Sequence, residues 1–266
     1  MERERELKIG VMNNPAGNLL KEIQWIGENR FDFVDLTLEP PGAYSLAIDI
    51  DAVRELLDKY NMNAIGHTAY YLPFASPFQS FYELALRELK NCFEVFQALD
   101  IQKVNIHADE FSSSMLGRDR AIARNIKAMK SACAEAKRYG IELMIENTPA
   151  LFGSVDELGM LFSEIPDMRF HLDVGHANLY TDRNKTDELL GRFHDRLSHV
   201  HLSDNKSGTA DLHLPLGAGL IPWDKVIASI KKHGYDGTMT LELFSKDRRY
   251  LLASREKLIE LWDSAG

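Results

Sequence analysis

The sequence has few of the features that mark the more specialised classes of protein. Only 2 of its 266 residues are cysteine, Cys92 and Cys133, and because they lack metal-type spacing we expect buried free thiols and no disulfide. No apolar run approaches the roughly 20 residues needed to cross a bilayer. Lysine and arginine number 31 against 40 acidic residues, and the net charge of −9 disfavours broad attraction to nucleic acid or anionic membranes. The stretch MERERELKIG is charged where an export signal would be apolar, so we expect a cytoplasmic protein with no membrane partner.

What the sequence does contain is a regular alternation of two kinds of segment. Short runs rich in branched and aromatic residues alternate with longer amphipathic runs, the pattern of βα units and a parallel sheet. Eight candidate strands can be counted, at residues 7–12, 31–38, 63–69, 103–108, 141–147, 169–175, 197–203 and 238–244. The length also suits one α/β barrel of roughly 250 residues. The sequence therefore predicts an α/β fold, a single (β/α)8 TIM barrel that forms one domain over residues 1–266.

Several expected helices carry their own end signals. Ser154 stands three residues before Glu157, the spacing of a capping box. Gly140 and Gly234 follow helical runs, where glycine adopts a left-handed conformation without a Cβ penalty. These signals support the alternation of strands and helices.

Histidines and acids gather at the C-terminal ends of the expected strands and in the loop after the seventh. In a parallel barrel these positions surround one mouth. The residues are Glu39, His67, His107, Glu146, Asp173, His176, His201, Asp211, His213 and Glu242. No lysine or arginine is interleaved at the strand ends, and a group of unpaired buried carboxylates would be costly. A bound divalent metal resolves this conflict, and imidazole with carboxylate suits zinc, manganese, iron or cobalt.

Other interpretations of these residues compete with metal binding. A single histidine at a strand end is more often a hydrogen-bonded structural residue, and Asp173 and Glu242 could cap helices or pair with distant arginines. His171 and His199 alternate in phase with the strand-end residues one layer deeper, which indicates a core or supporting role. The aromatic group at 70–74 could cover a ligand or pack on the barrel rim.

At this point the chain resembles the xylose isomerase-like barrel superfamily, which includes sugar phosphate isomerases and epimerases together with endonuclease IV. The resemblance covers essentially the whole chain. Its most specific segments are IENTP, LDVGH, HVHLSDN, DLHLPLGAGLIPW and LELF.

Sugar epimerases of this superfamily typically hold one divalent ion with two glutamates, an aspartate and a histidine, which match Glu146, Glu242, Asp173 and His201. The resemblance implies that the two glutamates are the catalytic acid/base pair beside the metal and that His176 contacts substrate. Tyr70, Glu39 and His107 are further expected substrate contacts, and Lys206 would meet a phosphate. These epimerases commonly carry an arginine shortly after the strand-seven histidine, and this sequence departs from that pattern, with Lys206 and Ser207 in the region.

Endonuclease IV uses a wider ligand set for three zinc ions, and this sequence has a matching residue at each place. The matching sets are His67, His107 and Glu146; Glu146, Asp173, His201 and Glu242; and His176, Asp211 and His213. Two segments depart from this pattern. LELF stands where endonuclease IV usually has a Glu-Thr dipeptide followed by a proline, and DLTLEPP does not resemble its DNA-intercalating loop.

The leading hypothesis is therefore a metal-dependent sugar or sugar phosphate isomerase or epimerase with one to three divalent ions, zinc or manganese. The alternative is a zinc-dependent phosphodiesterase acting on abasic DNA, and a third interpretation is a metal-dependent sugar-binding or regulatory barrel that has lost turnover. The expected partner is a small-molecule sugar or sugar phosphate, with nucleic acid only under the alternative. A homo-oligomer is compatible with the sequence.

Overall fold

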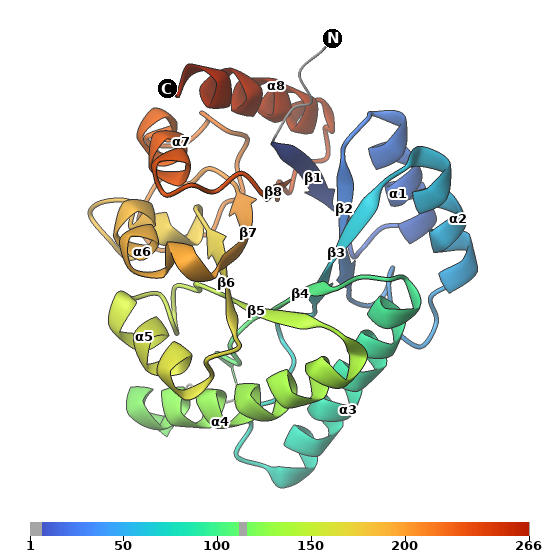
Figure 1. The fold of residues 1–266 in the computed structure, drawn as a ribbon, viewed down its shortest axis with the longest axis vertical. Helices are drawn as coiled ribbons and strands as arrows, with labels where there is room; N and C mark the ends of the chain where they lie inside the picture. The colour runs from blue at the N-terminus through green and yellow to red at the C-terminus, as the bar shows by residue number, and fades with distance from the viewer. Residues whose placement is uncertain (1–6, 112–115, 266) are drawn as a thin grey trace.

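Eight parallel strands close into a barrel in which each strand pairs with the next along the chain and β8 pairs with β1 (Figure 1). The computed structural model describes residues 7–111 and 116–265. The strands are β1 (Lys8–Met12), β2 (Phe33–Leu38), β3 (Asn63–Thr68), β4 (Lys103–Ile106), β5 (Glu142–Glu146), β6 (Arg169–Asp173), β7 (Leu197–Leu202) and β8 (Thr238–Leu241). Every predicted strand is present, slightly shorter than expected. The prediction of a single (β/α)8 TIM barrel is confirmed.

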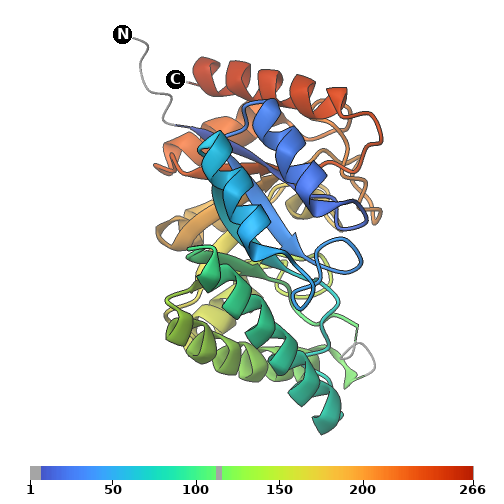
Figure 2. The ribbon, with the colours of Figure 1, turned by 90° about the vertical axis from the view of Figure 1, so that its right-hand side faces the viewer.

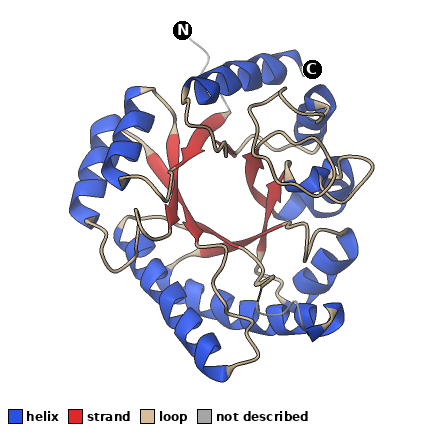
Figure 3. Cartoon of the chain, turned by 180° about the vertical axis from the view of Figure 1, so that it is seen from behind, coloured by secondary structure: helices blue, strands red, loops and turns tan. Residues whose placement is uncertain are grey.

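Helices surround this ring of strands on the outside (Figure 3). The α-helices are α1 (Leu19–Glu28), α2 (Ile50–Tyr60), α3 (Gln79–Ala98), α4 (Arg118–Ala136), α5 (Val155–Glu164), α6 (Thr186–Phe193), α7 (Trp223–Lys232) and α8 (Arg249–Ser264). Short 3-10 turns are η2 (Lys137–Tyr139), η3 (His176–Asn178) and η4 (His194–Arg196). Within the described residues, none of these helices combines the length and apolarity required to cross a membrane.

The predicted helix ends have a physical basis in the structure. The Ser154 side chain caps α5 by accepting a hydrogen bond from the Glu157 backbone N–H. The Glu157 carboxylate accepts a hydrogen bond from the N–H of Phe152, two residues before the N-cap N–H that a capping box uses. Gly140 and Gly234 have φ values of 71° and 75°, in the left-handed region expected for residues that end helices. Cys92 on α3 and Cys133 on α4 are buried free thiols, as predicted.

The two faces of the barrel strands have different chemistry. Successive residues of a strand point to opposite faces, so Val34 and Leu36 face the helices while Asp35 faces the barrel interior. Inside the barrel, Phe33, Ile65 and Met144 form a small apolar cluster separate from the main core. The interior above this cluster is filled with histidines, acids, threonine and asparagine. The loops that follow the strands lie together at one end of the barrel, on the right in Figure 2.

Candidate metal centre

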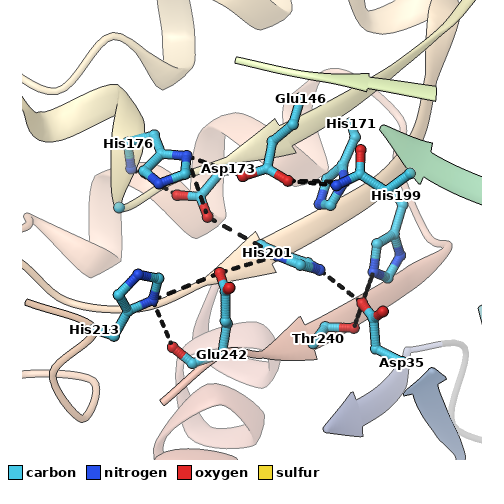
Figure 4. Close-up of polar contacts among 12 residues, drawn as sticks. Asp35, Glu146, His171, Asp173, His176, His199, His201, His213, Thr240 and Glu242 are labelled. Carbon is cyan, nitrogen blue, oxygen red and sulfur yellow. Dashed lines mark hydrogen bonds and ion pairs between the residues drawn. The ribbon is translucent and has the colours of Figure 1, made fainter. Parts of the chain in front are cut away.

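The mouth formed by the C-terminal strand ends draws ionisable side chains from most of the chain into contact (Figure 4). Glu146 and Asp173 end β5 and β6, and Glu242 directly follows β8. Strand register places His201 of β7 beside Asp173. The Asn147 side chain hydrogen-bonds both the backbone N–H and the carbonyl of Asp173, which fixes the end of β6. Parallel pairing of the strands thus brings these side chains together.

The first group of side chains lies over β3, β4 and β5. His67 Nε2 and His107 Nε2 are 3.1 Å apart, and His107 Nε2 is 3.0 Å from Glu146 Oε2. Asn105 donates a hydrogen bond of 2.6 Å to the same Glu146 oxygen. One ligand atom from each of His67, His107 and Glu146 lies within 4.8 Å of the others, close enough for all three to bind one ion.

The second group lies at the centre of the mouth. His176 Nδ1 is 2.9 Å from Glu146 Oε1 and 3.8 Å from Asp173 Oδ2. On the other side of Asp173, His201 Nδ1 is 4.0 Å from the same Asp173 oxygen and 3.0 Å from Glu242 Oε2. Asp173 therefore lies between the two glutamates that the sequence identified as acid/base candidates.

The third group is supplied by the loop after β7. Asp211 Oδ2 lies 2.9 Å from both His176 Nε2 and His213 Nε2. His213 has a left-handed backbone with φ of 44°, a conformation that costs a non-glycine residue about 1–3 kcal/mol. An antiparallel bridge between Asp204 and Leu214 holds the base of this loop.

The Asp204 carboxylate organises the rest of the loop. It accepts hydrogen bonds from the backbone N–H groups of Gly217 and Ile221 and from the Trp223 indole. Because Asp204 is fully buried, these bonds stabilise the loop conformation that carries Asp211 and His213.

Burial and the neighbouring charges shift the pKa values of several groups in the mouth. Burial, followed by the charges of Glu146 and Glu242, raises the pKa of Asp173 to about 7. Burial raises the pKa of Glu242, but the charges of His213 and His201 outweigh burial and lower this pKa to about 2. Burial lowers the pKa of His213, but Glu242 and Asp211 outweigh burial and raise this pKa to about 9. The opposite shifts of Glu242 and His213 are those of a carboxylate beside an imidazolium, and a cation that binds there would displace the imidazolium proton.

Unsatisfied polar atoms test whether a cation fits these residues. Among the described residues, buried atoms without a hydrogen-bond partner include Glu146 Oε1, Asp173 Oδ2 and His176 Nδ1. Glu146 Oε1 and His176 Nδ1 lie 2.9 Å apart but lack the alignment of a hydrogen bond. Such orphaned groups are costly in a protein interior. A mixed imidazole and carboxylate set with unused lone pairs fits a transition-metal ion such as zinc or manganese.

Of the residues expected to contact substrate, all but Lys206 line one cavity. A cavity of about 690 Å³ opens above the ligand groups, and Glu39, Tyr70, His107 and His176 line it. Lys206 is exposed on the loop after β7 and is not among the lining residues, so the geometry gives no support to the phosphate contact proposed for it. The cis peptide bond between Pro40 and Pro41 lies in the cavity wall, as do the exposed aromatic side chains of Tyr70, Phe111, Tyr180 and Phe244.

Two buried polar residues at the site were not singled out from the sequence. Asp35 of β2 contacts His201, and Asn105 of β4 bonds Glu146. The available signal was a polar residue in the middle of a short strand, between two apolar residues. His171 and His199 were correctly assigned to a deeper layer, since both are fully buried below the mouth.

Comparison with known proteins agrees with this architecture. The family model described as xylose isomerase-like TIM barrel matches residues 23–261. The crystal structure of a D-tagatose 3-epimerase-like protein superposes with a TM-score of 0.83 at 25% identity, covering 97% of this chain and 98% of that chain. An uncharacterized protein of Methanocaldococcus jannaschii is 27% identical over 254 residues, 91% of this chain and 84% of the relative. A probable endonuclease 4 of Thermosipho melanesiensis is 23% identical over 197 residues, 65% of this chain and 68% of the relative.

Proposed function

This chain belongs to the xylose isomerase-like TIM barrel family, and from that premise we propose that it is a metal-dependent sugar epimerase or isomerase. The observation that carries the proposal is the arrangement of Glu146 and Glu242 on either side of Asp173 and His201. The similarity to a D-tagatose 3-epimerase-like structure over nearly the whole of both chains supports it.

The residues that would hold a divalent ion for this reaction are Glu146, Asp173, His201 and Glu242. The chemistry that such an ion supplies is polarisation of a carbonyl and an adjacent hydroxyl, which acidifies the neighbouring C–H group. Nearby imidazoles, acting against burial, hold the pKa values of Glu146 and Glu242 below their usual range, which favours the proton-accepting carboxylate form of each. One glutamate, as a carboxylate, accepts the C–H proton. The other, which carries a proton at that step, gives it to the opposite face of that carbon, or to the neighbouring carbon in an isomerisation, and is left as a carboxylate.

We further propose that the substrate is a sugar without a phosphate group. The carboxylates of Glu39 and Glu110 line the cavity, and a phosphate bound there would lie in their repulsive field. No lysine or arginine is among the residues that line this cavity in the described ranges 7–111 and 116–265. The aromatic and proline side chains of the wall suit the apolar face of a neutral sugar.

The third ligand group favours a second candidate function, a multi-metal phosphodiesterase. His176, Asp211 and His213 can hold an ion in addition to those at the centre of the mouth, as in the three-zinc endonuclease pattern. The cavity wall argues against DNA as the substrate, since recognition of a DNA backbone depends on basic side chains that contact phosphates.

Metal analysis together with substrate assays tests the proposal. Purified protein would be dialysed against zinc or manganese, analysed for bound metal, and assayed on neutral ketoses, their phosphorylated counterparts and abasic-site DNA. We expect turnover of a neutral ketose that a chelator abolishes and metal restores. About one bound equivalent favours sugar chemistry and about three favour phosphodiester chemistry. Cleavage of abasic DNA without sugar turnover would overturn the proposal.

A further inference from the structure

Asp35 lies beneath the candidate metal centre, on β2, and contacts histidines of two ligand groups. Its side chain is 1% exposed. His201 Nε2 donates a 2.7 Å hydrogen bond to Asp35 Oδ2, while His201 Nδ1 faces Glu242 at 3.0 Å. The other carboxylate oxygen, Asp35 Oδ1, is 3.8 Å from His67 Nδ1, an electrostatic contact longer than a hydrogen bond, while His67 Nε2 faces His107 at 3.1 Å. Both imidazoles therefore direct one nitrogen toward the mouth and the other toward Asp35.

We propose that Asp35 is a positioning residue shared by His201 and His67. This inference rests on the proposed metal-dependent function. A carboxylate that holds one ring nitrogen of a histidine fixes the tautomer and the ring orientation, and raises the basicity of the nitrogen that faces the metal. Because one aspartate contacts both histidines, it couples the first ligand group, which contains His67, to the second, which contains His201.

The surroundings of Asp35 hold the carboxylate in place. Thr240 donates a 3.0 Å hydrogen bond to Asp35 Oδ2, and His199 Nε2 lies 3.4 Å from the same oxygen. His199 is itself fixed between the hydroxyls of Thr240, at 2.9 Å, and Thr238, at 2.8 Å. Thr240 thus joins Asp35 and His199 in one hydrogen-bonded group, at the right of Figure 4.

The replacement Asp35→Asn separates this role from a purely structural one. The amide has nearly the shape of the carboxylate, but it carries no charge and has a single carbonyl oxygen. Its NH2 group would therefore replace either the acceptor of the His201 hydrogen bond or the oxygen that faces His67. Loss of a carboxylate that supports a metal-binding histidine typically weakens metal affinity by about 10–100-fold. A carboxylate that only stabilises the fold would change unfolding and leave metal affinity unaltered.

The experiment measures zinc affinity by competition with a chromophoric chelator and records the visible spectrum of the cobalt-substituted protein. For Asp35→Asn we expect about 10–100-fold weaker zinc binding and an altered cobalt spectrum. The matched control is Glu22→Gln, which removes another buried carboxylate, paired with Arg248 outside the barrel. It should change thermal stability and leave both metal readouts as in the wild type.

Each result has a defined meaning. Wild-type zinc affinity and an unchanged cobalt spectrum in Asp35→Asn overturn the inference while the proposed function stands. A wild-type protein that binds neither ion overturns the proposed metal dependence itself. If Asp35→Asn does not fold, Thr240→Val decides, because it removes a donor that holds the carboxylate. We then expect a few-fold loss of zinc affinity, and no loss would overturn the inference.

Discussion

Glu146 connects two of the three ligand groups at the barrel mouth. Its Oε2 atom lies 3.0 Å from His107 and its Oε1 atom 2.9 Å from His176. Each group approaches a different oxygen of the same carboxylate, so one substitution at this position disturbs both. Variants of Glu146 therefore test the candidate site most directly.

We expect Glu146→Gln to lose metal and to slow sugar turnover by roughly 10²–10⁴-fold, the usual contribution of a general acid or base. Elemental analysis and steady-state kinetics measure the two effects. The matched control is Glu142→Gln, on the same strand but at the opposite end, where the carboxylate accepts from Ser198 and pairs with Arg169. Glu142→Gln should retain activity. A near-normal rate for Glu146→Gln would show that this glutamate transfers no proton.

At the residue scale, the sequence identified the strand-end residues but not the residues beneath them. Strand position alone predicted that Glu146, Asp173 and Glu242 would surround one mouth. Asp35 was not predicted although apolar and polar residues alternate from Val34 to Leu38, because such alternation usually places the polar residues in solvent, whereas both faces of β2 are buried and Asp35 lies in the barrel interior. The position of Lys206 depends on the backbone turn at Ser207 and Gly208, both with positive φ, and the sequence does not specify that turn.

At the element scale, β1 and β2 pack closely only because position 10 is glycine. A Cβ atom at Gly10 would lie 2.3 Å from the Phe33 ring. A Cβ atom at Gly159, in the middle of α5, would meet no neighbouring atom within 4 Å. The two glycines thus differ in whether a methyl group can be accommodated.

We predict opposite effects of alanine at these two glycines. Gly10→Ala should lower the free energy of unfolding by about 1–3 kcal/mol through overpacking. Gly159→Ala should raise it by about 0.5–1 kcal/mol, since alanine has the higher helix propensity. Urea unfolding of both variants measures the difference. Wild-type stability in Gly10→Ala would show that the Phe33 ring moves aside without cost.

The loop after β7 gives a second prediction at this scale. Asp204→Asn replaces an acceptor with an amide whose NH2 group would face the backbone donors of Gly217 and Ile221. We expect a loss of about 1–3 kcal/mol for the unsatisfied donors, and faster protease cleavage within 203–222. Asp224→Asn, at an exposed position in the first turn of α7, is the control and should cleave at the wild-type rate. Equal cleavage rates in the two variants would mean that Asp204 does not hold the loop.

The presence of the strands could be predicted from the sequence more completely than the hydrogen bonds at the helix ends. Each of the eight strands was recognised from its run of branched and aromatic residues, because such runs suit a strand covered on both faces. The capping hydrogen bond of Ser154 was also predictable. The longer reach of Glu157 to Phe152 was not, since it depends on how the preceding loop folds back onto α5.

At the scale of the whole molecule, closure of the barrel is what assembles the candidate site. The repeated βα pattern was sufficient to predict that closure, and the shared mouth of a parallel barrel was then sufficient to predict which residues converge. The extent of one domain over residues 1–266 stays a prediction. Sequence alone could not specify the cavity wall, which is formed by loops whose conformations depend on tertiary contacts.

Binding of an ion at the proposed site should raise the free energy of unfolding of the whole protein. An ion at 100 times its dissociation constant adds about 2.7 kcal/mol to the free energy of unfolding. At roughly 2–4 °C for each kcal/mol in a domain of about this size, Tm should rise by about 5–10 °C with zinc or manganese. Thermal unfolding with and without a chelator measures this shift. Calcium should have little effect because it prefers all-oxygen ligands, and an equal shift with calcium would argue against the imidazole-containing site.

The interior hydrogen bonds of the barrel join distant parts of the chain. Asp35 and His201 are 166 residues apart in the sequence, and Asp35 and Thr240 are 205 apart. Contacts of such long range form late in folding, since each closes a large loop. A chain that still lacks β8 also lacks Glu242, so the group at the centre of the mouth is complete only once the last strand has docked.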